Sequence, residues 1–492
     1  MTFDLVIRGG RVFGPGDWGV VDVGVRDGRV AVLGQLGSAP AARVVDARGL
    51  VILPGLVDPH THIAMPLAGG MATCDDFLTG TVAAARGGIT TLSDFVQPRP
   101  GQSPGEALRE RLAQATGRAV VDYTFSMTLA SADAATLGEL PCLVEQGVRS
   151  FKMYTINPGL MLDDRSLLTC LRAIARTGAL ATVHAESAGM VGELMQGEGT
   201  AGRRGVAWFP RTRPPLAEAE AVGRVLVLAR LAGARLCIRH LSSAEGVAAV
   251  RAARRGVPVW VETAPQYLCL DESVYGREDG HRFIMTPPLR CREDREALWR
   301  ALREGTVHFL GTDHCALSVA QKDGAGEWAR VPGGVPGLET CLPLVYTLGV
   351  RTGRIGLARL AEVTSTCAAR AFDLFPRKGT LLPGADADLV LMDPATVRRV
   401  DVGEGGLGGL LGWSPYEGWR LAGWPRLVVS RGEVIVAEGE FCGRAGRGRY
   451  LGPSGEAWSV DTTRGRPGKT DAGPARESVT PQTVGGGTTP CW

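Results

Sequence analysis

The stretch GLVDPHTHI, Gly55–Ile63, is an apolar run that ends in two histidines. The whole chain has seven histidines among its 492 residues, so a pair separated by one residue needs an explanation. Alternate residues of a β-strand point to the same side, and His60 and His62 can therefore reach one metal ion. The stretch predicts a strand whose carboxyl end carries two metal ligands.

Seven further apolar stretches follow, separated by segments rich in Ala, Leu and Arg such as 106–116, 217–233 and 292–305, as in repeated βα units. Eight parallel strands are the number that closes a (β/α)8 barrel. The sequence therefore predicts an α/β fold with a TIM-like barrel. The eight candidate strands are LVILPGLVD (50–58), ITTLSDF (89–95), VVDYTFSMTL (120–129), SFKMYT (150–155), LATVHAE (180–186), RLCIRHL (235–241), PVWVETA (258–264) and VHFLGTD (307–313).

Short strands broken by glycine occupy both ends of the chain, for example FDLVIRGGRVF (3–13) and PRLVVSRGEVIVAEGEF (425–441). This shared pattern of short strands and glycines predicts one small β-sandwich domain assembled from residues 1–55 and 380–450. The barrel domain is then expected over residues 56–379. Residues 452–492 are dominated by Gly, Pro, Ser, Thr and Arg, and we expect a disordered tail there.

Charge and hydropathy argue against several classes of protein. The 54 basic and 51 acidic residues give a net charge of +3, and no long basic run indicates a nucleic-acid surface. No run of about 18 apolar residues indicates a membrane span. Eleven cysteines without a CxxC pair favour a reducing compartment, and the start MTFDLVIRGG lacks the features of a secretion signal. We expect a cytoplasmic protein that acts on a small molecule and binds neither nucleic acid nor membrane.

Polar residues stand on or just after five of the eight predicted strands. The carboxyl ends of barrel strands converge on one face, where active sites lie, so these side chains are expected to meet. Imidazoles and a carboxylate without nearby thiolates favour zinc or a similar ion. A single histidine at a strand end is more often a hydrogen-bonded core residue, but the joint pattern predicts a metal site. Its members are His60, His62, Lys152, His184, His240 and Asp313.

Lys152 is unusual because this chain has fifty arginines and only four lysines. It lies in the apolar window VRSFKMYT, where burial lowers the pKa of an amine. A neutral amine can add carbon dioxide to form a carbamate, an anion able to bridge two cations, whereas arginine stays protonated. The alternative is a lysine paired with a carboxylate.

Two metals bridged by a carbamate would activate a water molecule, and Asp313 would carry its proton to a leaving nitrogen. This is machinery for hydrolysing an amide.

Motifs along most of the chain, from DLVIRGGRVF to GRGRYL, resemble the amidohydrolase superfamily, and within it the dihydropyrimidinase and hydantoinase group of cyclic amidases. The resemblance implies two divalent metal ions, most simply zinc, held by the six residues above with a carboxylated Lys152 as the bridge. It also implies a homotetramer or a homodimer. The motifs are PGLVDPHTH (54–62), SFKMY (150–154), HAES (184–187), HLSSAEG (240–246), MTPPLR (285–290), GTDHC (311–315), PGGVPGLE (332–339) and SPYEGW (414–419).

Positions that contact substrate in this family carry over with substitutions. The family holds the ring amide through main-chain groups at a serine, here Thr286, and at an asparagine, here Gly333. The tyrosine that the family places five residues after the lysine to polarise the scissile carbonyl is here Asn157. Tyr154 is nearby, and it is either a replacement or a core residue. These changes put the efficiency on the family's usual substrates in question.

The substrate class is narrowed by Ala64, which stands where the related dihydroorotases have an arginine for a substrate carboxylate. A neutral ring, either a dihydropyrimidine or a 5-substituted hydantoin, is therefore expected, and it would be opened to an N-carbamoyl amino acid. An allantoinase is the alternative enzyme. A non-catalytic scaffold of the same fold is an alternative of another class, although such relatives lack metal ligands that this chain keeps.

Overall fold

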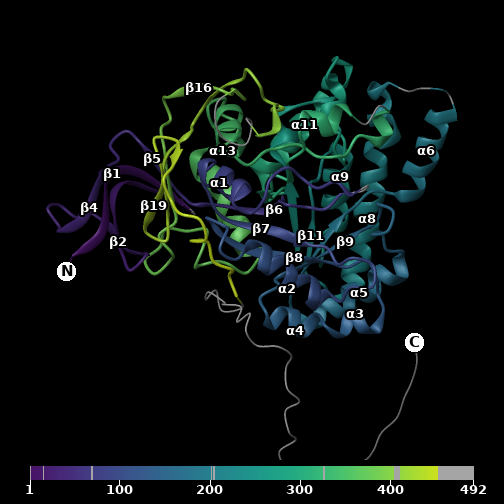
Figure 1. The fold of residues 1–492 in the computed structure, drawn as a ribbon, viewed down its shortest axis with the longest axis horizontal. Coiled ribbons are helices and arrows are strands. Elements are labelled where there is room, and N and C mark those ends of the chain that lie inside the picture. Colours follow the sequence, from purple (N-terminus) through teal and green to yellow (C-terminus); the bar gives the residue numbers. More distant parts are fainter. Residues whose placement is uncertain are drawn as a thin grey trace, which may run out of the picture. The chain divides into compact units, whose positions relative to one another are not determined.

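The computed structural model describes residues 2–14, 16–67, 70–200, 202, 205–324, 327–403 and 410–452 (Figure 1). The predicted tail, apart from residue 452, lies outside the described residues. Of the helices in the described part of the chain, none combines the length and the hydropathy required to cross a bilayer.

The central sheet is a closed parallel barrel, which confirms the predicted fold. Strands β6 to β12 pair in chain order, and nearly all of their residues are buried, which explains their continuous apolar sequences. β13 pairs with β12 and β14 pairs with β6, so residues 309–315 close the barrel as its eighth strand. The strands are β6 (Leu56–His62), β7 (Ile89–Val96), β8 (Asp122–Thr128), β9 (Ser150–Tyr154), β10 (Leu180–His184), β11 (Leu236–Ile238), β12 (Val259–Thr263), β13 (Phe309–Leu310) and β14 (His314–Cys315).

Helices surround this barrel, and Figure 1 shows α5, α8, α9 and α11 on its outer side. Local sequence fixes their ends. The Ser103 hydroxyl accepts from the Glu106 backbone N–H in a capping box that begins α2, and Gly305 ends α11 at a φ of 79°. The longer helices are α1 (Thr79–Arg86), α2 (Pro104–Ala115), α5 (Asp164–Thr177), α6 (Ala188–Thr200), α8 (Pro215–Ala232), α9 (Ala244–Ala253) and α11 (Arg292–Glu304).

Shorter helices lie in the connections and towards the end of the described chain. They are α3 (Ala134–Gly138), α4 (Leu140–Glu145), α7 (Phe209–Thr212), α10 (Pro265–Cys269), α12 (Val319–Asp323), α13 (Cys341–Val345), α14 (Leu357–Ala361) and α15 (Cys367–Ala371).

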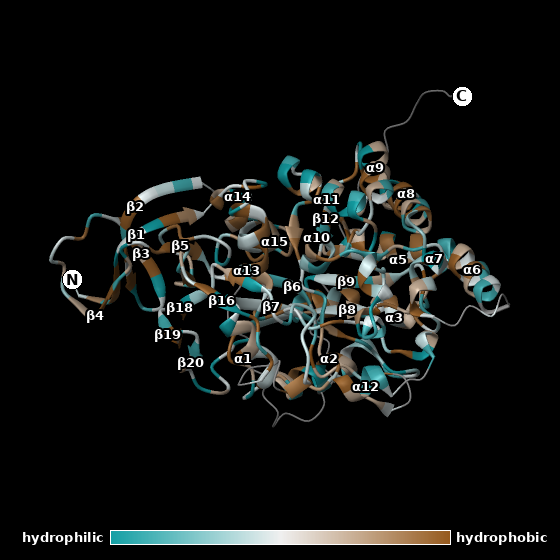
Figure 2. Ribbon diagram, turned by 90° about the horizontal axis from the view of Figure 1, so that it is seen from above, coloured by the Kyte–Doolittle hydropathy of each residue, from teal (hydrophilic) through white to brown (hydrophobic). Residues whose placement is uncertain are grey.

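A second, mixed sheet draws its strands from both ends of the chain, as the sequence predicted. Its order is β20-β19-β18-β15-β5-β1-β2-β3, with β4 paired to β1. Its core includes Ile7, Val23, Ile52 and Leu389, and Figure 2 shows the hydrophobic colour on β5. The strands are β1 (Phe3–Gly14), β2 (Gly16–Arg26), β3 (Arg29–Gly34), β4 (Ala41–Asp46), β5 (Val51–Pro54), β15 (Leu389–Met392), β18 (Pro425–Ser430), β19 (Glu433–Ala437) and β20 (Glu440–Phe441); β16 (Val397–Arg399) and β17 (Arg420–Ala422) form a separate pair.

The first predicted barrel strand, residues 50–58, is divided at Gly55. Its first half is β5 of the mixed sheet and its second half is β6 of the barrel. A side chain at Gly55 would collide with Thr90, whose Oγ1 lies 2.1 Å from the place of a Cβ, so the chain passes between the two sheets at a glycine. The described residues form one compact unit, and the domain limits at 55 and 380 stay predictions.

A buried lysine joins the two sheets. Lys378 Nζ lies 2.7 Å from Asp122, at the amino end of β8, and 2.7 Å from Asp388, just before β15. Asp386 completes the group at 3.0 Å. Burial by itself lowers the pKa of Lys378, but the three carboxylates raise it above its ordinary value. The cluster is thus a compensated ion group that fastens the barrel to the mixed sheet.

Candidate active site

A cavity of about 180 Å³ opens at the carboxyl ends of the barrel strands, and all ten residues predicted for the site line it. Three of them have backbone φ angles in the left-handed region, which non-glycine residues rarely adopt: Asn157 at 86°, His240 at 37° and Asp313 at 51°. Backbone of this kind concentrates at functional sites, where it aims side chains. The ten are His60, His62, Lys152, Tyr154, Asn157, His184, His240, Thr286, Asp313 and Gly333.

Two histidines and a carboxylate converge on one side of this cavity. The Nε2 atoms of His60 and His62 lie 3.0 and 3.1 Å from the same Oδ1 of Asp313. His60 Nδ1 lies 2.6 Å from Glu262 Oε1, so the glutamate fixes the ring and leaves Nε2 as the coordinating nitrogen. The ligand atoms of His60, His62 and Asp313 lie within 4.8 Å of one another, close enough to hold one ion.

The other two histidines, His184 and His240, also line the cavity, with ring centroids 4.5 Å apart. His184 Nε2 lies 2.7 Å from Glu186, which leaves Nδ1 for an ion, and Arg213 lies 2.6 Å from the same carboxylate oxygen. His240 Nδ1 has no hydrogen-bond partner among the described residues. Burial lowers the pKa of both imidazoles, which keeps them neutral as metal binding requires.

Lys152 comes from β9 and reaches the same cavity with its side chain only 1% exposed. Its Nζ lies over the rings of Tyr154 and Phe95, 5.0 and 5.6 Å from their centroids. Within the described part of the chain Nζ makes no hydrogen bond or ion pair, although the nearby charges of Glu262 and Asp313 act on it. Burial lowers the pKa of Lys152 to about 7.

Comparison with known proteins fits this geometry. Residues 51–435 match the Amidohydrolase family. The chain belongs to this family. Amidohydrolases depend on metal ions, and the His60, His62 and Asp313 cluster is a candidate place for one.

Named relatives span nearly the whole described chain. The D-hydantoinase of Geobacillus stearothermophilus is 37% identical over 91% of this chain and 96% of its own length. The D-hydantoinase of Streptomyces coelicolor is 40% identical over 92% and 98%. The crystal structure of dihydropyrimidinase from Brevibacillus agri superposes with a TM-score of 0.88 at 37% identity, over 92% of this chain and 99% of that one. An L-hydantoinase structure from Arthrobacter aurescens gives 0.85 at 31% identity, over 92% and 100%.

The carboxylates that hold the ligands of this amidohydrolase were not predicted from the sequence. Glu262 accepts from His60 and from the buried Arg239, and Glu186 accepts from His184. Glu262 stands in the otherwise apolar strand PVWVETA, and an acidic residue in such a strand was the available signal. The structure shows that this acid is fully buried. The pairing of Glu262 with His60 could not be predicted, because the two residues are 202 positions apart in the sequence.

Three of the four predicted substrate positions lie on loops around the cavity, and Tyr154 is the last residue of β9. Thr286 and Gly333 are on neighbouring segments, since the Gly334 N–H donates to Ile284 O at 2.9 Å. Asn157 begins a turn and accepts at its main-chain oxygen from Leu160 and Met161. The Tyr154 ring packs 5.8 Å from the His184 ring and also lines the cavity. Their roles in binding stay predictions.

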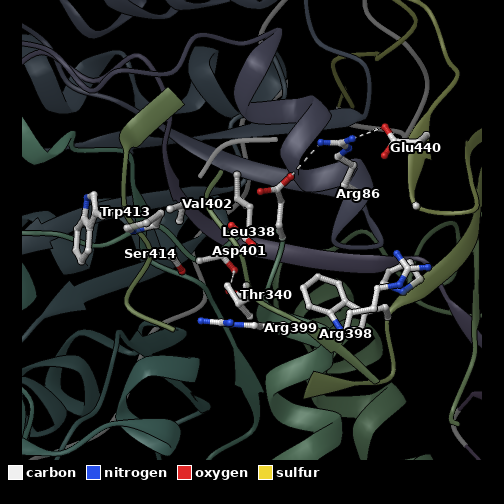
Figure 3. Close-up of a pocket in the computed structure, with 17 residues that line it drawn as sticks. Arg86, Leu338, Thr340, Arg398, Arg399, Asp401, Val402, Trp413, Ser414 and Glu440 are labelled. Atoms are coloured by element: carbon white, nitrogen blue, oxygen red, sulfur yellow. Dashed lines mark hydrogen bonds and ion pairs between the residues drawn. The ribbon is translucent and has the colours of Figure 1, made fainter. Parts of the chain in front are cut away.

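A larger cavity, of about 300 Å³, lies apart from the histidines, between the segment 336–340 and the β16–β17 region (Figure 3). In it, Arg86 makes ion pairs with Glu339 and Glu440. The lining also includes Arg398, Arg399 and Asp401, so basic and acidic residues are equal in number there. This cavity favours no class of ligand, and the chemistry of the protein is assigned to the barrel mouth.

Proposed function

We propose that this amidohydrolase opens the cyclic amide of a dihydropyrimidine or a 5-substituted hydantoin by adding water, giving an N-carbamoyl amino acid. The observation that carries the proposal is the meeting of four histidines, one aspartate and an unpaired buried lysine in one cavity. The names of the relatives, D-hydantoinase and dihydropyrimidinase, support the same chemistry.

The donor set fits two divalent ions. His60 and His62 would hold one and His184 and His240 the other, with Asp313 as a further ligand, and this mixture of imidazole and carboxylate suits zinc. An amine with no oxygen partner is a suitable site for carboxylation, so carbamylated Lys152 is proposed as the anionic bridge. When bound, the ions would supply Lewis-acid activation of water and of the ring carbonyl.

Asp313 is proposed to move the proton. Burial raises its pKa, but the contacts with His60 and His62 outweigh this and hold the pKa below its ordinary value, so the group is a carboxylate at neutral pH. It accepts a proton from the attacking water. The hydroxyl adds to the ring carbonyl carbon, the C–N bond breaks, and Asp313 returns the proton to the leaving nitrogen. Main-chain groups at Thr286 and Gly333 are proposed to orient the ring amide.

The lining of the cavity supports a neutral ring. None of its described lining residues is an arginine. Arg111, which contacts the main chain at Ala64, is engaged: it donates to Ala64 O at 3.1 Å and pairs with Asp94 at 2.5 Å. A substrate carboxylate would therefore meet no free guanidinium, unlike in a dihydroorotase.

A panel assay tests the proposal. Dihydrouracil, 5-phenylhydantoin, allantoin and dihydroorotate are supplied to the zinc-loaded protein, and ring opening is followed by absorbance. Turnover of dihydrouracil or 5-phenylhydantoin is expected. Turnover of dihydroorotate alone would overturn the neutral-ring assignment, and turnover of allantoin alone would make the allantoinase alternative correct.

Metal analysis separates the enzyme from the scaffold alternative. Two ions per chain are expected after reconstitution with zinc and bicarbonate, and at most one tightly bound ion would contradict the bridged site. The assembly is proposed to be a cytoplasmic homotetramer or homodimer, which light scattering of the purified protein resolves.

A further inference from the structure

Helix α12 binds three loops through three consecutive residues. Gln321 donates to Ala72 O at 2.8 Å and accepts from Cys74 Sγ at 2.9 Å. Asp323 accepts from Arg282 at 2.8 and 2.7 Å and lies 2.7 Å from His281 Nε2. The residue between them, Lys322, points the other way, into the protein, and is the one buried residue of the helix.

Lys322 is fully buried, yet its partners are two main-chain carbonyls. Nζ lies 2.9 Å from Ile284 O and 2.8 Å from Pro332 O. In the described part of the chain it has no carboxylate partner. Ile284 O also accepts from Gly334 N, so these atoms form one hydrogen-bonded junction between the two segments.

The two segments carry the proposed ring contacts. Ile284 stands two residues before Thr286, and Pro332 stands immediately before Gly333. Both contacts line the histidine cavity, whereas Lys322 does not. Gly333 has no side chain that could hold its loop. A Cβ built at this position would contact only Met285 Cα, at 3.7 Å. The spacing of the two main-chain contacts therefore depends on the junction behind them.

The chemistry of lysine suits this junction. An arginine would bring a wider, planar group with donors in a fixed fork, whereas an amine can turn its hydrogens towards two converging carbonyls. Leaving a buried carbonyl without its donor is costly. The chain uses lysine rather than arginine here although it has fifty arginines.

We propose that Lys322 is a positioning residue that sets the distance between the Thr286 and Gly333 loops and so governs affinity for the ring rather than bond cleavage. The inference rests on the proposed function, because these loops matter for affinity only if they hold the substrate. Groups that bind substrate and transition state alike change KM and leave kcat.

The test compares Lys322→Met with Lys378→Met in the zinc-loaded full-length protein, using 5-phenylhydantoin. Both changes remove a fully buried amino group, but Lys378 lies at the junction of the two sheets, away from the cavity. We expect Lys322→Met to raise KM about tenfold with kcat within about twofold, and Lys378→Met to change neither by more than about twofold. Equal KM values in the two variants, or a fall in kcat alone, would overturn the proposal.

Amide hydrogen exchange gives a readout that does not need turnover. Segments 284–286 and 332–335 are expected to exchange faster in Lys322→Met than in Lys378→Met, and equal exchange would refute the junction. Should the parent protein open none of the rings, the proposed function fails while this comparison still decides on the junction. If Lys322→Met does not fold, Asp323→Asn loosens the same helix from Arg282, and a smaller rise in KM is expected from it.

Discussion

Lys152 and Lys378 are equally buried lysines at opposite ends of the barrel, and their surroundings are opposite. Lys378 at the amino end of β8 meets three carboxylates, and its pKa is raised. Lys152 at the carboxyl ends meets aromatic rings and histidines, and burial lowers its pKa. The first arrangement stabilises an ammonium, and the second disfavours it.

The difference teaches where to look for chemistry in this chain. A buried charge with its counter-ions complete is a structural fastening, whereas a buried amine without them is available to react. Lys322 lies between these cases, since it has hydrogen-bond partners but no counter-ion. All three lysines in the described chain are fully buried, so lysine is kept where a compact amine is needed and arginine is used elsewhere.

The largest effect is expected at Lys152. Lys152→Arg places a permanent cation between the metal positions, and we expect kcat/KM to fall about 10⁴-fold with loss of metal. Lys152→Ala leaves space that acetate or propionate can enter as a substitute bridge, so added acid should restore part of the activity in a dose-dependent way. Metal content and hydrolysis are measured for both variants. An active Lys152→Arg protein would show that Lys152 resembles Lys378 after all.

Asp313→Asn tests the proton path while keeping an oxygen ligand. The amide cannot accept the proton of water at neutral pH, so turnover is expected to fall about 10³-fold. Thermal unfolding and zinc content should stay close to those of the parent. Near-parental kcat would move the general base to another residue.

Lys378→Met tests the other end of the barrel. Three carboxylates lose their shared ammonium, and we expect a loss of about 3 kcal/mol in the free energy of unfolding. Arg431, 3.2 Å from Asp122, offsets part of the cost. Urea unfolding measures the change. An unchanged midpoint would show that the cluster does not fasten the two sheets.

The smallest expected effect is the pH dependence of the free energy of unfolding, which differs between Lys322 and Lys378. Burial lowers the pKa of Lys322 to about 7 in the folded chain, from an ordinary value of 10.5. Between these values the unfolded chain binds more protons, so stability rises with pH by about 1 kcal/mol per unit relative to Lys322→Met. Lys378 adds no slope between pH 7.5 and 9, because its raised pKa gives stability that is full below 10.5 and is lost only at higher pH. The measurement is the free energy of unfolding of the parent, Lys322→Met and Lys378→Met at pH 7.5 and 9. An equal change with pH in the parent and in Lys322→Met would contradict the assignment.

Much of the barrel and the composition of its cavity could be predicted because both depend on order along the chain. Buried parallel strands appear as apolar runs, and residues at their carboxyl ends must meet. The division of the first strand at Gly55 was harder to predict, since VILP and LVDP are both apolar. The requirement for glycine at this position comes from its packing against Thr90, which the sequence does not show. Pairings such as His60 with Glu262, or Lys322 with Pro332 O, join distant segments and leave no periodic mark in the sequence.

The mixed sheet has a consequence for how the chain folds as it is synthesised. Barrel strands β7 to β12 each pair with the preceding strand, so they can pair as they emerge from the ribosome. β5 must wait, because its neighbour β15, with Val390 opposite Leu53, is made only after the whole barrel. A nascent chain that pauses before residue 389 therefore carries an open, apolar edge on β5. Nascent chains on neighbouring ribosomes of one messenger RNA would mispair at this edge.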